Sequence, residues 1–531
     1  MKSTQIPFQK TGFFSNIMSD YLEQATNIQP FYTNFSNIEG FRNQLKEKQC
    51  SFTSDSRKAL VAALTKQYAG FVMSDKTQAN VDGLLQPTTF TVTTGHQLNL
   101  FTGPLYFLYK IISAINLAEE LHEQFPQYHF VPVYWMATED HDFDEINFFN
   151  FKNQKNQWTR NDGGAVGRFD TEGLDAVFEL FSNQLGTSKN AAYLKNLFSD
   201  GYLKHHNLAD ATRYITNELF AEYGLVIIDG DDVQLKTSFA PYVIDELTKQ
   251  VSFNEVSKTI DELAKHYKIQ VNPREINLFY LNENSRERIV FDGKIYKVNN
   301  TEISWSLVEL QKEVNTFPER FSPNVIMRPL YQEVVLPNLA YIGGGGELAY
   351  WLELKAYFKS VSIPFPILLL RNSVQIISAK QQRKLNSLDI SKEELFLDLH
   401  ELLALKVKEN STIQLDFSKL KEQLKTQFDQ LKETATQTDI SFLGAVNAQE
   451  KKQLNGLEKL EKRLLRAEKR RQKELVARIT EIKNQLFPNQ SLEERQRNFA
   501  EYYLEYGADF IEVLKKNLKP LELTFTVLEM D

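Results

Sequence analysis

Residues 89–104 read TFTVTTGHQLNLFTGP, and they predict a strand that runs through a polar turn into a helix. The first residues alternate threonine with phenylalanine and valine, as β-strands do. Pro104 suits the first turn of a helix, where a missing N–H group costs nothing, and Leu105, Leu108 and Ile112 follow at helical spacing. We therefore expect the hydrogen-bonding side chains of this turn to form one wall of a small-molecule site.

Four more apolar runs end at polar or glycine-rich turns. They are FVPVYWMA (130–137), GLVIIDGDD (224–232), NLAYIGGGG (338–346) and FPILLLRNS (365–373). Nearly continuous apolar runs are typical of strands that are covered on both faces of a parallel sheet. We predict an α/β fold with a Rossmann-type, doubly wound parallel sheet, in which ligands bind outside the carboxyl ends of the strands.

A chain of 531 residues is long enough for two or three structural units. The predicted core spans residues 1–390 and carries insertions at about 150–330. Residues 391–490 predict an antiparallel helical coiled coil with its turn at 436–449, because apolar side chains recur at spacings of three and four. Residues 491–531 return to a globular pattern, and the apolar stripes of the coiled coil predict a homodimer.

Composition excludes several classes of protein. A net charge of −8 and an isoelectric point near 5.7 argue against a nucleic-acid partner, and we interpret the basic run at 463–473 as a solvated coiled-coil face. Cys50 is the only cysteine, which excludes an intramolecular disulfide and a zinc site built on several thiolates. No signal peptide or membrane span is evident, so we expect a cytoplasmic protein without a membrane partner.

The opening turn supplies the first candidate site residues. Gly95 permits a backbone conformation that other residues resist, and His96 and Gln97 offer donors and acceptors where the sheet meets a helix. Thr102 and Gly103 close the same turn and are added as binding residues. The alternative is structural, with His96 capping the turn and Gln97 satisfying loop backbone.

A crowded acidic segment, ATEDHDFDEIN (137–147), follows the second strand. Its titratable residues are Glu139, Asp140, His141, Asp142, Asp144 and Glu145. Five carboxylates cannot all stay ionised at close range without a cation or shifted pKa values. The functional options are a divalent metal, recognition of an ammonium group, or acid–base work by His141. The alternative is a helix N-terminus rich in acids, and we assign no metal ligands.

A glycine-rich turn and its upstream helix form the third group. The candidate binding residues here are Gly344, Gly345, Glu347, Arg328, Gln332 and Asn338. Glycines let backbone N–H groups approach an anion, and Arg328 suits a carboxylate or phosphate. Glu347 is otherwise a first-turn acid, and Arg328 otherwise a partner in a surface ion pair.

Two aspartates follow the strand at 224–229. Asp229 and Asp231 resemble ribose-binding carboxylates by position, although aspartates that form turns are as common there. Serine-hydrolase chemistry has no support, because no GxSxG motif is present.

Together these segments resemble one protein family. The segments TTGHQLNLFTGPLYFLYKIISAINLA (93–118), VPVYWMATEDHDFDEIN (131–147), GLVIIDGDD (224–232) and RPLYQEVVLPNLAYIGGGGELAYW (328–351) are similar to BshC, the cysteine ligase family of bacillithiol biosynthesis. The resemblance covers essentially the whole chain, including its length and the late coiled-coil segment.

The resemblance implies a Rossmann-type core related to class I aminoacyl-tRNA synthetases, connecting-peptide-like insertions and a coiled coil used for dimerisation. It implies that cysteine is joined to the amine of glucosaminyl-malate as an amide. ATP or a related nucleotide, with Mg²⁺ as its companion, is the expected energy source. His96 and Gln97 stand where the synthetases carry their HIGH signature, so His96, Gln97, His141 and Asp142 are the candidate catalytic residues.

Two departures from the synthetases limit the comparison. No KMSKS-type loop follows the last strand, where SAKQQRK (378–384) is only a loose basic echo, and the ligands of a thiol-selecting zinc are missing. Two rival hypotheses remain open: a nucleotidyl- or glycosyltransferase on the same sheet, and a non-catalytic interaction protein built around the coiled coil.

Overall fold

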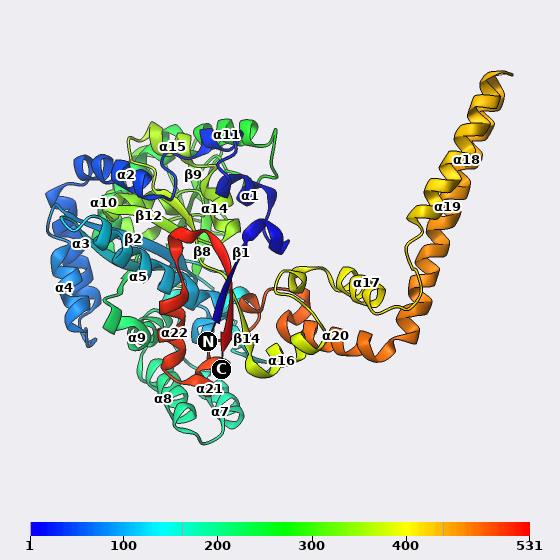
Figure 1. Ribbon diagram of the computed structural model, residues 1–531. Helices are drawn as coiled ribbons and strands as arrows, with labels where there is room; N and C mark the ends of the chain where they lie inside the picture. The colour runs from blue at the N-terminus through cyan, green and yellow to red at the C-terminus, as the bar shows by residue number, and fades with distance from the viewer. Residues whose placement is uncertain (1, 162, 439, 531) are drawn as a thin grey trace.

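A five-stranded parallel sheet organises the body of the protein (Figure 1), seen in a computed structural model that describes residues 2–161, 163–438 and 440–530. Its spatial order is β13 (Ile367–Leu370), β12 (Asn338–Gly343), β2 (Thr89–His96), β3 (His129–Met136) and β6 (Val226–Asp229). All neighbouring strands are parallel. Counted along the chain, this is the order 5-4-1-2-3 of a doubly wound Rossmann-type sheet. The predicted fold class is confirmed, and all five predicted strands lie in this sheet.

Both faces of the sheet are buried because alternate residues of each strand point to opposite sides. Val92, Ile342 and Leu369 belong to one hydrophobic cluster, whereas Tyr341 and Leu368 belong to the other. The connection from β2 to β3 is helix α5 (Tyr106–Gln124), and its residues contribute to both clusters. The sheet is therefore a rigid platform whose strand ends can hold a site.

The turn between β2 and α5 is held in a strained conformation. Phe101 and Thr102 have left-handed φ angles of 47° and 67°. The ring of Phe101 packs among four phenylalanine rings at centroid distances of 5.1–5.5 Å. Asn498, from the far end of the chain, donates from Nδ2 to the carbonyl oxygens of Phe101 and Gly103, both at 2.7 Å. These contacts fix the path of the chain directly after His96.

Two insertions interrupt the sheet. The first, between β3 and β6, comprises α6 (Phe143–Ile146), β4 (Phe148–Phe151), β5 (Gln154–Gln157), α7 (Leu174–Leu185), α8 (Lys189–Lys204) and α9 (Leu208–Phe220). The second follows α10 (Val233–Lys249) and comprises α11 (Val251–Leu263), β7 (Leu278–Asn282), β8 (Ser285–Phe291), β9 (Tyr296–Val298), β10 (Ser304–Trp305), α12 (Leu307–Thr316), β11 (Phe321–Pro323) and α13 (Arg328–Val335). Strands β7 to β11 form an antiparallel sheet. The range 150–330 thus also contains core strand β6 and helix α10.

The remaining body helices lie at the N-terminus and beside the glycine turn. They are α1 (Asn16–Leu22), α2 (Ile38–Ser51), α3 (Ser54–Gln67), α4 (Asp75–Gly83), α14 (Gly345–Trp351) and α15 (Lys355–Ser360). None of the described helices is both long enough and apolar enough to cross a membrane.

A helical arm projects from the body (Figure 1). Its base comprises α16 (Ala379–Ser387), α17 (Leu399–Glu409) and α20 (Lys473–Leu486), and its projecting hairpin comprises α18 (Ser418–Thr436) and α19 (Ile440–Arg471). The turn lies at the start of the predicted range 436–449, between the end of α18 at Thr436 and the beginning of α19 at Ile440, and the rest of that range belongs to α19. Phe428 and Ala435 of α18 pack there against Val446. The basic segment 378–384 opens helix α16 instead of forming a loop.

After the arm, the chain returns to the body through α21 (Ala500–Tyr506), α22 (Asp509–Asn517) and β15 (Thr524–Met530). β15 lies between β1 (Lys2–Pro7), which is antiparallel to it, and β14 (Val374–Ser378), which is parallel. A buried ion pair fastens this returning segment: Glu494 accepts from Nη2 of Arg371 at 2.6 Å, with side-chain exposures of 1% and 4%. Ser373 Oγ and the N–H of Val374 also donate to Glu494.

We predict that Glu494→Ala lowers the free energy of unfolding by about 3–5 kcal/mol, because it leaves Arg371 buried without its counter-ion. Urea unfolding followed by tryptophan fluorescence measures this, since the four tryptophans, at 135, 158, 305 and 351, all lie in the body. The control is Lys58→Ala, which removes an exposed ion pair with Asp55 and should cost less than about 1 kcal/mol. Equal losses in the two variants would contradict the role given to Glu494.

Candidate active site

A cavity of about 740 Å³ lies at the carboxyl ends of the parallel strands, closed on one side by the antiparallel sheet of the second insertion. The three predicted segments and Arg328 meet on its wall. The predicted residues that line it are Gly95, His96, Gln97, Glu139, Asp140, His141, Arg328, Gly344 and Glu347. The location of the cavity follows from the topology of the sheet. β2 and β12 are neighbouring strands, and the chain leaves their carboxyl ends towards opposite edges of the sheet, which is where ligands bind in folds of this type.

His96 ends strand β2 and contributes a neutral imidazole. Its side chain is 7% exposed and packs against the rings of Tyr106 and Phe107. Burial, followed by the positive charges of Lys110 and Arg371, holds the pKa of His96 well below its usual value. No hydrogen bond from a described residue reaches Nε2. His96 therefore contributes an uncharged ring to the cavity wall, with Nε2 buried and unpaired among the described residues.

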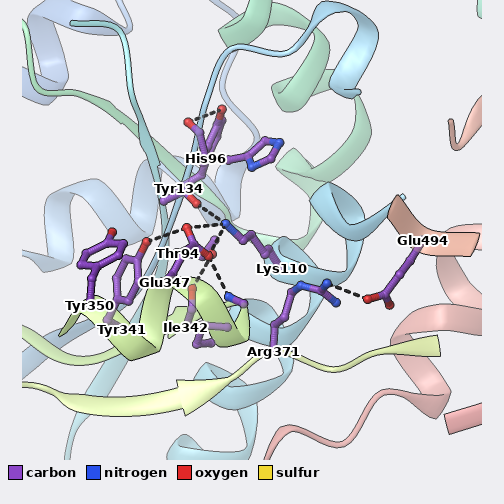
Figure 2. Close-up of polar contacts among 12 residues, drawn as sticks. Thr94, His96, Lys110, Tyr134, Tyr341, Ile342, Glu347, Tyr350, Arg371 and Glu494 are labelled. Carbon is purple, nitrogen blue, oxygen red and sulfur yellow. Dashed lines mark hydrogen bonds and ion pairs between the residues drawn. The ribbon is translucent and has the colours of Figure 1, made fainter. Parts of the chain in front are cut away.

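Lys110 links the two strand ends that flank the cavity (Figure 2). Its ammonium group donates to the carbonyl oxygen of Gly95 at 2.7 Å and contacts both carboxylate oxygens of Glu347 at 2.7 and 2.8 Å. Burial lowers the pKa of Lys110, although the charge of Glu347 opposes that shift. Burial alone would raise the pKa of Glu347, but Lys110 and the N–H of Gly344 hold it below its usual value. Both groups remain charged as a buried pair.

The glycine turn is arranged differently from a free anion cradle. The N–H of Gly344 donates to Glu347 Oε2 at 2.7 Å, so part of the turn is already occupied by the carboxylate of the same helix. Gly345 faces away from the cavity, since a Cβ there would lie 3.1 Å from Met18. Gly346 lines the cavity, and a Cβ there would meet nothing within 4 Å. Gly95 is constrained, because a Cβ would lie 3.0 Å from the hydroxyl of Tyr341.

Gln97 organises the acidic segment. Its Nε2 donates to Asp140 at 2.8 Å and to Glu145 at 2.9 Å. Burial would raise the pKa of Asp140, but hydrogen bonds from His141 and Gln97 and the charge of Arg286 hold it well below its usual range. Asp140 is therefore a carboxylate at neutral pH, suited to a cationic group.

Glu139 and His141 are held by basic residues. Glu139 forms a buried ion pair with Lys236, although burial still raises its pKa. Arg286 donates from Nη1 to Nδ1 of His141 at 2.9 Å. Since arginine can only donate, Nδ1 of His141 is the acceptor in this hydrogen bond. His141 is thereby held on the cavity wall by an arginine of the second insertion.

Several predicted residues lie off the cavity wall. Asp142 and Asp144 are exposed on the first insertion, and Gly103 and Thr102 lie in the strained turn. Asp231 forms a two-point ion pair with Arg168, and its N–H donates to Asp229. Burial, followed by the charge of Asp231, raises the pKa of Asp229 to about 6.

Gln332 and Asn338 form a buried network behind Arg328. Gln332 Oε1 accepts from Arg328 at 3.1 Å, and both amides donate to Glu333. Glu333 in turn pairs with the buried Lys48. The network fixes the position of Arg328, whose guanidinium also donates to Tyr350 and lies over the ring of Tyr341.

Sequence reasoning missed most of the positive charge in the cavity. The basic residues on its wall that were not predicted are Lys110, Arg274, Arg286, Arg288, Arg371 and Arg495. Two of them carry a sequence signal. Lys110 interrupts the apolar run LYFLYKIISAI, where a lone lysine needs a buried partner, and Arg371 directly follows strand β13 in the predicted run 365–373. The others come from the second insertion and the returning C-terminal segment. Among the described residues, no three His, Cys, Asp or Glu side chains are grouped as ligands for a metal ion.

We predict that His96→Asn makes protein stability less sensitive to acid. The pKa of folded His96 lies below its unfolded value of about 6.5, so the unfolded chain binds the extra proton and the wild type loses stability as pH falls below that value. Removing the imidazole should flatten the dependence between pH 7 and pH 5 by up to about 1.4 kcal/mol per pH unit. Urea unfolding over pH 5–8 measures it, and the two curves should run parallel above pH 7. An identical loss of stability below pH 7 in the wild type and the variant would contradict the prediction.

Comparisons with known proteins identify the family of the chain. A family model described as "Bacillithiol biosynthesis BshC, N-terminal Rossmann-like domain" matches residues 1–372. A second, described as "Bacillithiol biosynthesis BshC, C-terminal coiled-coil domain", matches residues 374–530. Two relatives bear the name "Putative cysteine ligase BshC". The one from Flavobacterium psychrophilum is 54% identical over 530 residues, covering 100% of both chains, and that from Flavobacterium johnsoniae is 53% identical over 528 residues, covering 99% of this chain and 100% of its own.

A solved structure from Campylobacter jejuni, titled as a putative arginyl t-RNA synthetase, covers 83% of this chain and 96% of its own at 10% identity and a TM-score of 0.23. A likeness this weak carries no argument, so the relation to class I synthetases stays a prediction. The two family models and the full-length relatives agree with the fold and confirm the predicted family. The chain belongs to the BshC family of bacillithiol biosynthesis.

Proposed function

We propose that this protein joins L-cysteine to the amine of glucosaminyl-malate, the last step of bacillithiol synthesis. The family relationship indicates the reaction, and one observation about the site supports it most directly. One cavity combines the neutral imidazole of His96, whose Nε2 has no partner among the described residues, with the ionised carboxylate of Asp140 and several guanidinium groups. Substrates that carry ammonium and carboxylate groups match this distribution of charge.

Amide formation needs two chemical aids. A free carboxylate is a poor acyl donor, so we propose that a nucleoside triphosphate activates the carboxyl group of cysteine. The amine must also lose a proton as it attacks the activated carbonyl carbon. His96 is the proposed acceptor of that proton, because its ring lines the cavity and is neutral at pH 7, and no described residue is hydrogen-bonded to Nε2.

The other charged residues of the cavity suit different groups of the two substrates. Asp140, oriented by Gln97, suits an ammonium group of either substrate. Lys110, Arg371 and Arg495 lie near the glycine turn, where they suit the anionic groups of the activated donor. The cytoplasm, where cysteine and nucleoside triphosphates are made, is the proposed location.

We predict that the purified protein makes bacillithiol from cysteine, glucosaminyl-malate and ATP, detected by mass spectrometry of the thiols. His96→Asn should reduce kcat by about 10²–10⁴-fold, the usual contribution of a general base, with folding intact by circular dichroism. The matched control is His400→Asn, an exposed histidine beside the arm, which should retain full activity. Nucleotide-sugar turnover that is independent of cysteine would favour a transferase instead.

We also propose that the arm joins two copies of the chain. Leu420 and Leu431 lie 11 residues apart on α18, and Phe442 and Leu460 lie 18 residues apart on α19, so each pair shares one face of its helix. These four side chains are 47–54% exposed, on a hairpin that stands clear of the body (Figure 1). A second arm is the partner that would cover such a stripe by coiled-coil packing.

The dimer is tested by light scattering. We predict that the wild-type protein elutes with twice the mass of one chain, and that replacing Leu420, Leu431, Phe442 and Leu460 together by serine gives a monomer with the same helix content. Val72→Ser, which changes an 86% exposed residue on the body, is the control. A wild-type protein that stays monomeric at micromolar concentration would contradict the proposal.

A further inference from the structure

The antiparallel sheet of the second insertion presents arginines to the cavity. Arg286 and Arg288 lie two residues apart on β8, so their side chains leave the same face of the strand. Phe279 of β7 is directly opposite Arg288 in the register and lines the same cavity. Arg274, four residues before β7 begins, is the third arginine on this wall.

The three arginines differ in what holds them. Arg286 is fully engaged: it donates to Ser322 Oγ at 3.1 Å, to the carbonyl of Pro323 at 3.0 Å and to His141 at 2.9 Å, and it lies 4.1 Å over the ring of Phe279. The guanidinium groups of Arg274 and Arg288 form no hydrogen bond or ion pair with a residue that the structure describes. Both side chains are exposed towards the cavity.

Two guanidinium groups that line one cavity without counter-ions among the described residues favour a ligand with two negative groups. Each can bind one carboxylate through two parallel N–H···O bonds. Among the other cations, Lys110 pairs with Glu347 and Arg371 pairs with Glu494. Arg495 is also exposed and without a side-chain partner among the described residues, but it stands alone on the returning C-terminal segment, whereas Arg274 and Arg288 belong to the same insertion. The wall formed by Arg274 and Arg288 is therefore the part of the cavity best suited to a dicarboxylate.

We propose that Arg274 and Arg288 form a subsite for the malyl group of the acceptor substrate and determine the specificity for it. This assignment rests on the proposed ligase function. It also fits the neighbouring charges, because Asp140 lies within the field of Arg286 and next to the same wall. In glucosaminyl-malate the amine and the malyl group leave the sugar from adjacent carbons, so an acid beside a pair of arginines matches both groups of one ligand.

The first test is binding, which does not depend on activity. Isothermal titration of the full-length protein with malate should give saturable binding, and Arg274→Gln with Arg288→Gln should weaken it by about tenfold to a hundredfold. Titration with ATP serves as the second arm and should be unchanged in the double variant. The matched control is Arg42→Gln, an exposed arginine on α2 that pairs with Glu39. Absence of malate binding to the wild type, or its persistence in the double variant, would overturn the proposal.

The second test is kinetic. In the double variant the KM for glucosaminyl-malate should rise at least tenfold, while the KM values for cysteine and ATP stay unchanged. An acceptor that lacks the malyl group, methyl glucosaminide, should react equally with both proteins. A raised KM for ATP alone would assign the arginines to nucleotide phosphates and overturn the malyl assignment. If no ligase activity is found but malate binding is lost in the variant, the proposed function fails and the dicarboxylate subsite stands.

Discussion

The ion pair between Lys110 and Glu347 is the interaction on which the site depends. It joins helix α5, which follows β2, to helix α14, which follows β12, across the point where the two connections diverge. A buried ammonium group is stable only with good partners, and Lys110 has both the carboxylate and the carbonyl oxygen of Gly95. The same charge helps to keep His96 neutral. One lysine thus ties together the segments that follow two paired strands, and its charge adds to the burial that keeps the imidazole neutral.

The net charge of the chain does not indicate the charge of the cavity. The chain carries −8 overall, yet seven of the residues that line the cavity are lysine or arginine and three are aspartate or glutamate. A cavity with low-dielectric walls concentrates the field of its own residues, so its potential is set locally. An acidic protein can therefore bind anionic substrates. Two of the acids, Glu139 and Asp140, follow strand β3, and the third, Glu347, is paired with Lys110 on the opposite side of β2. The end of β3 is therefore the position suited to an ammonium group, and the arginines offer separate positions for carboxylates.

The sequence predicted the strands and the place of the site, because both follow from local patterns. Apolar runs that end in polar turns identify parallel strands, and the topology brings their carboxyl ends together. It could not predict Arg288 or Arg495, since each reaches the cavity through contacts with residues distant in the chain. The glycine turn was interpreted as an anion cradle, but the carboxylate of Glu347 occupies the N–H of Gly344. The arm's turn is shorter than the predicted range, because Leu443 and Val446, read as linker, continue the apolar stripe that packs on α18.

The C-terminal segment that returns from the arm contributes residues to the candidate active site. Glu494 anchors Arg371, Arg495 lines the cavity, and Asn498 holds the strained turn after His96. All three belong to residues 374–530, which match the coiled-coil family model, whereas the cavity floor belongs to residues 1–372. The coiled-coil domain is therefore more than an attachment for a partner, because the polypeptide that leaves it completes the wall of the site. A chain cut after the parallel sheet would lose the counter-ion of Arg371 and the clamp on the turn, and with them the geometry around His96.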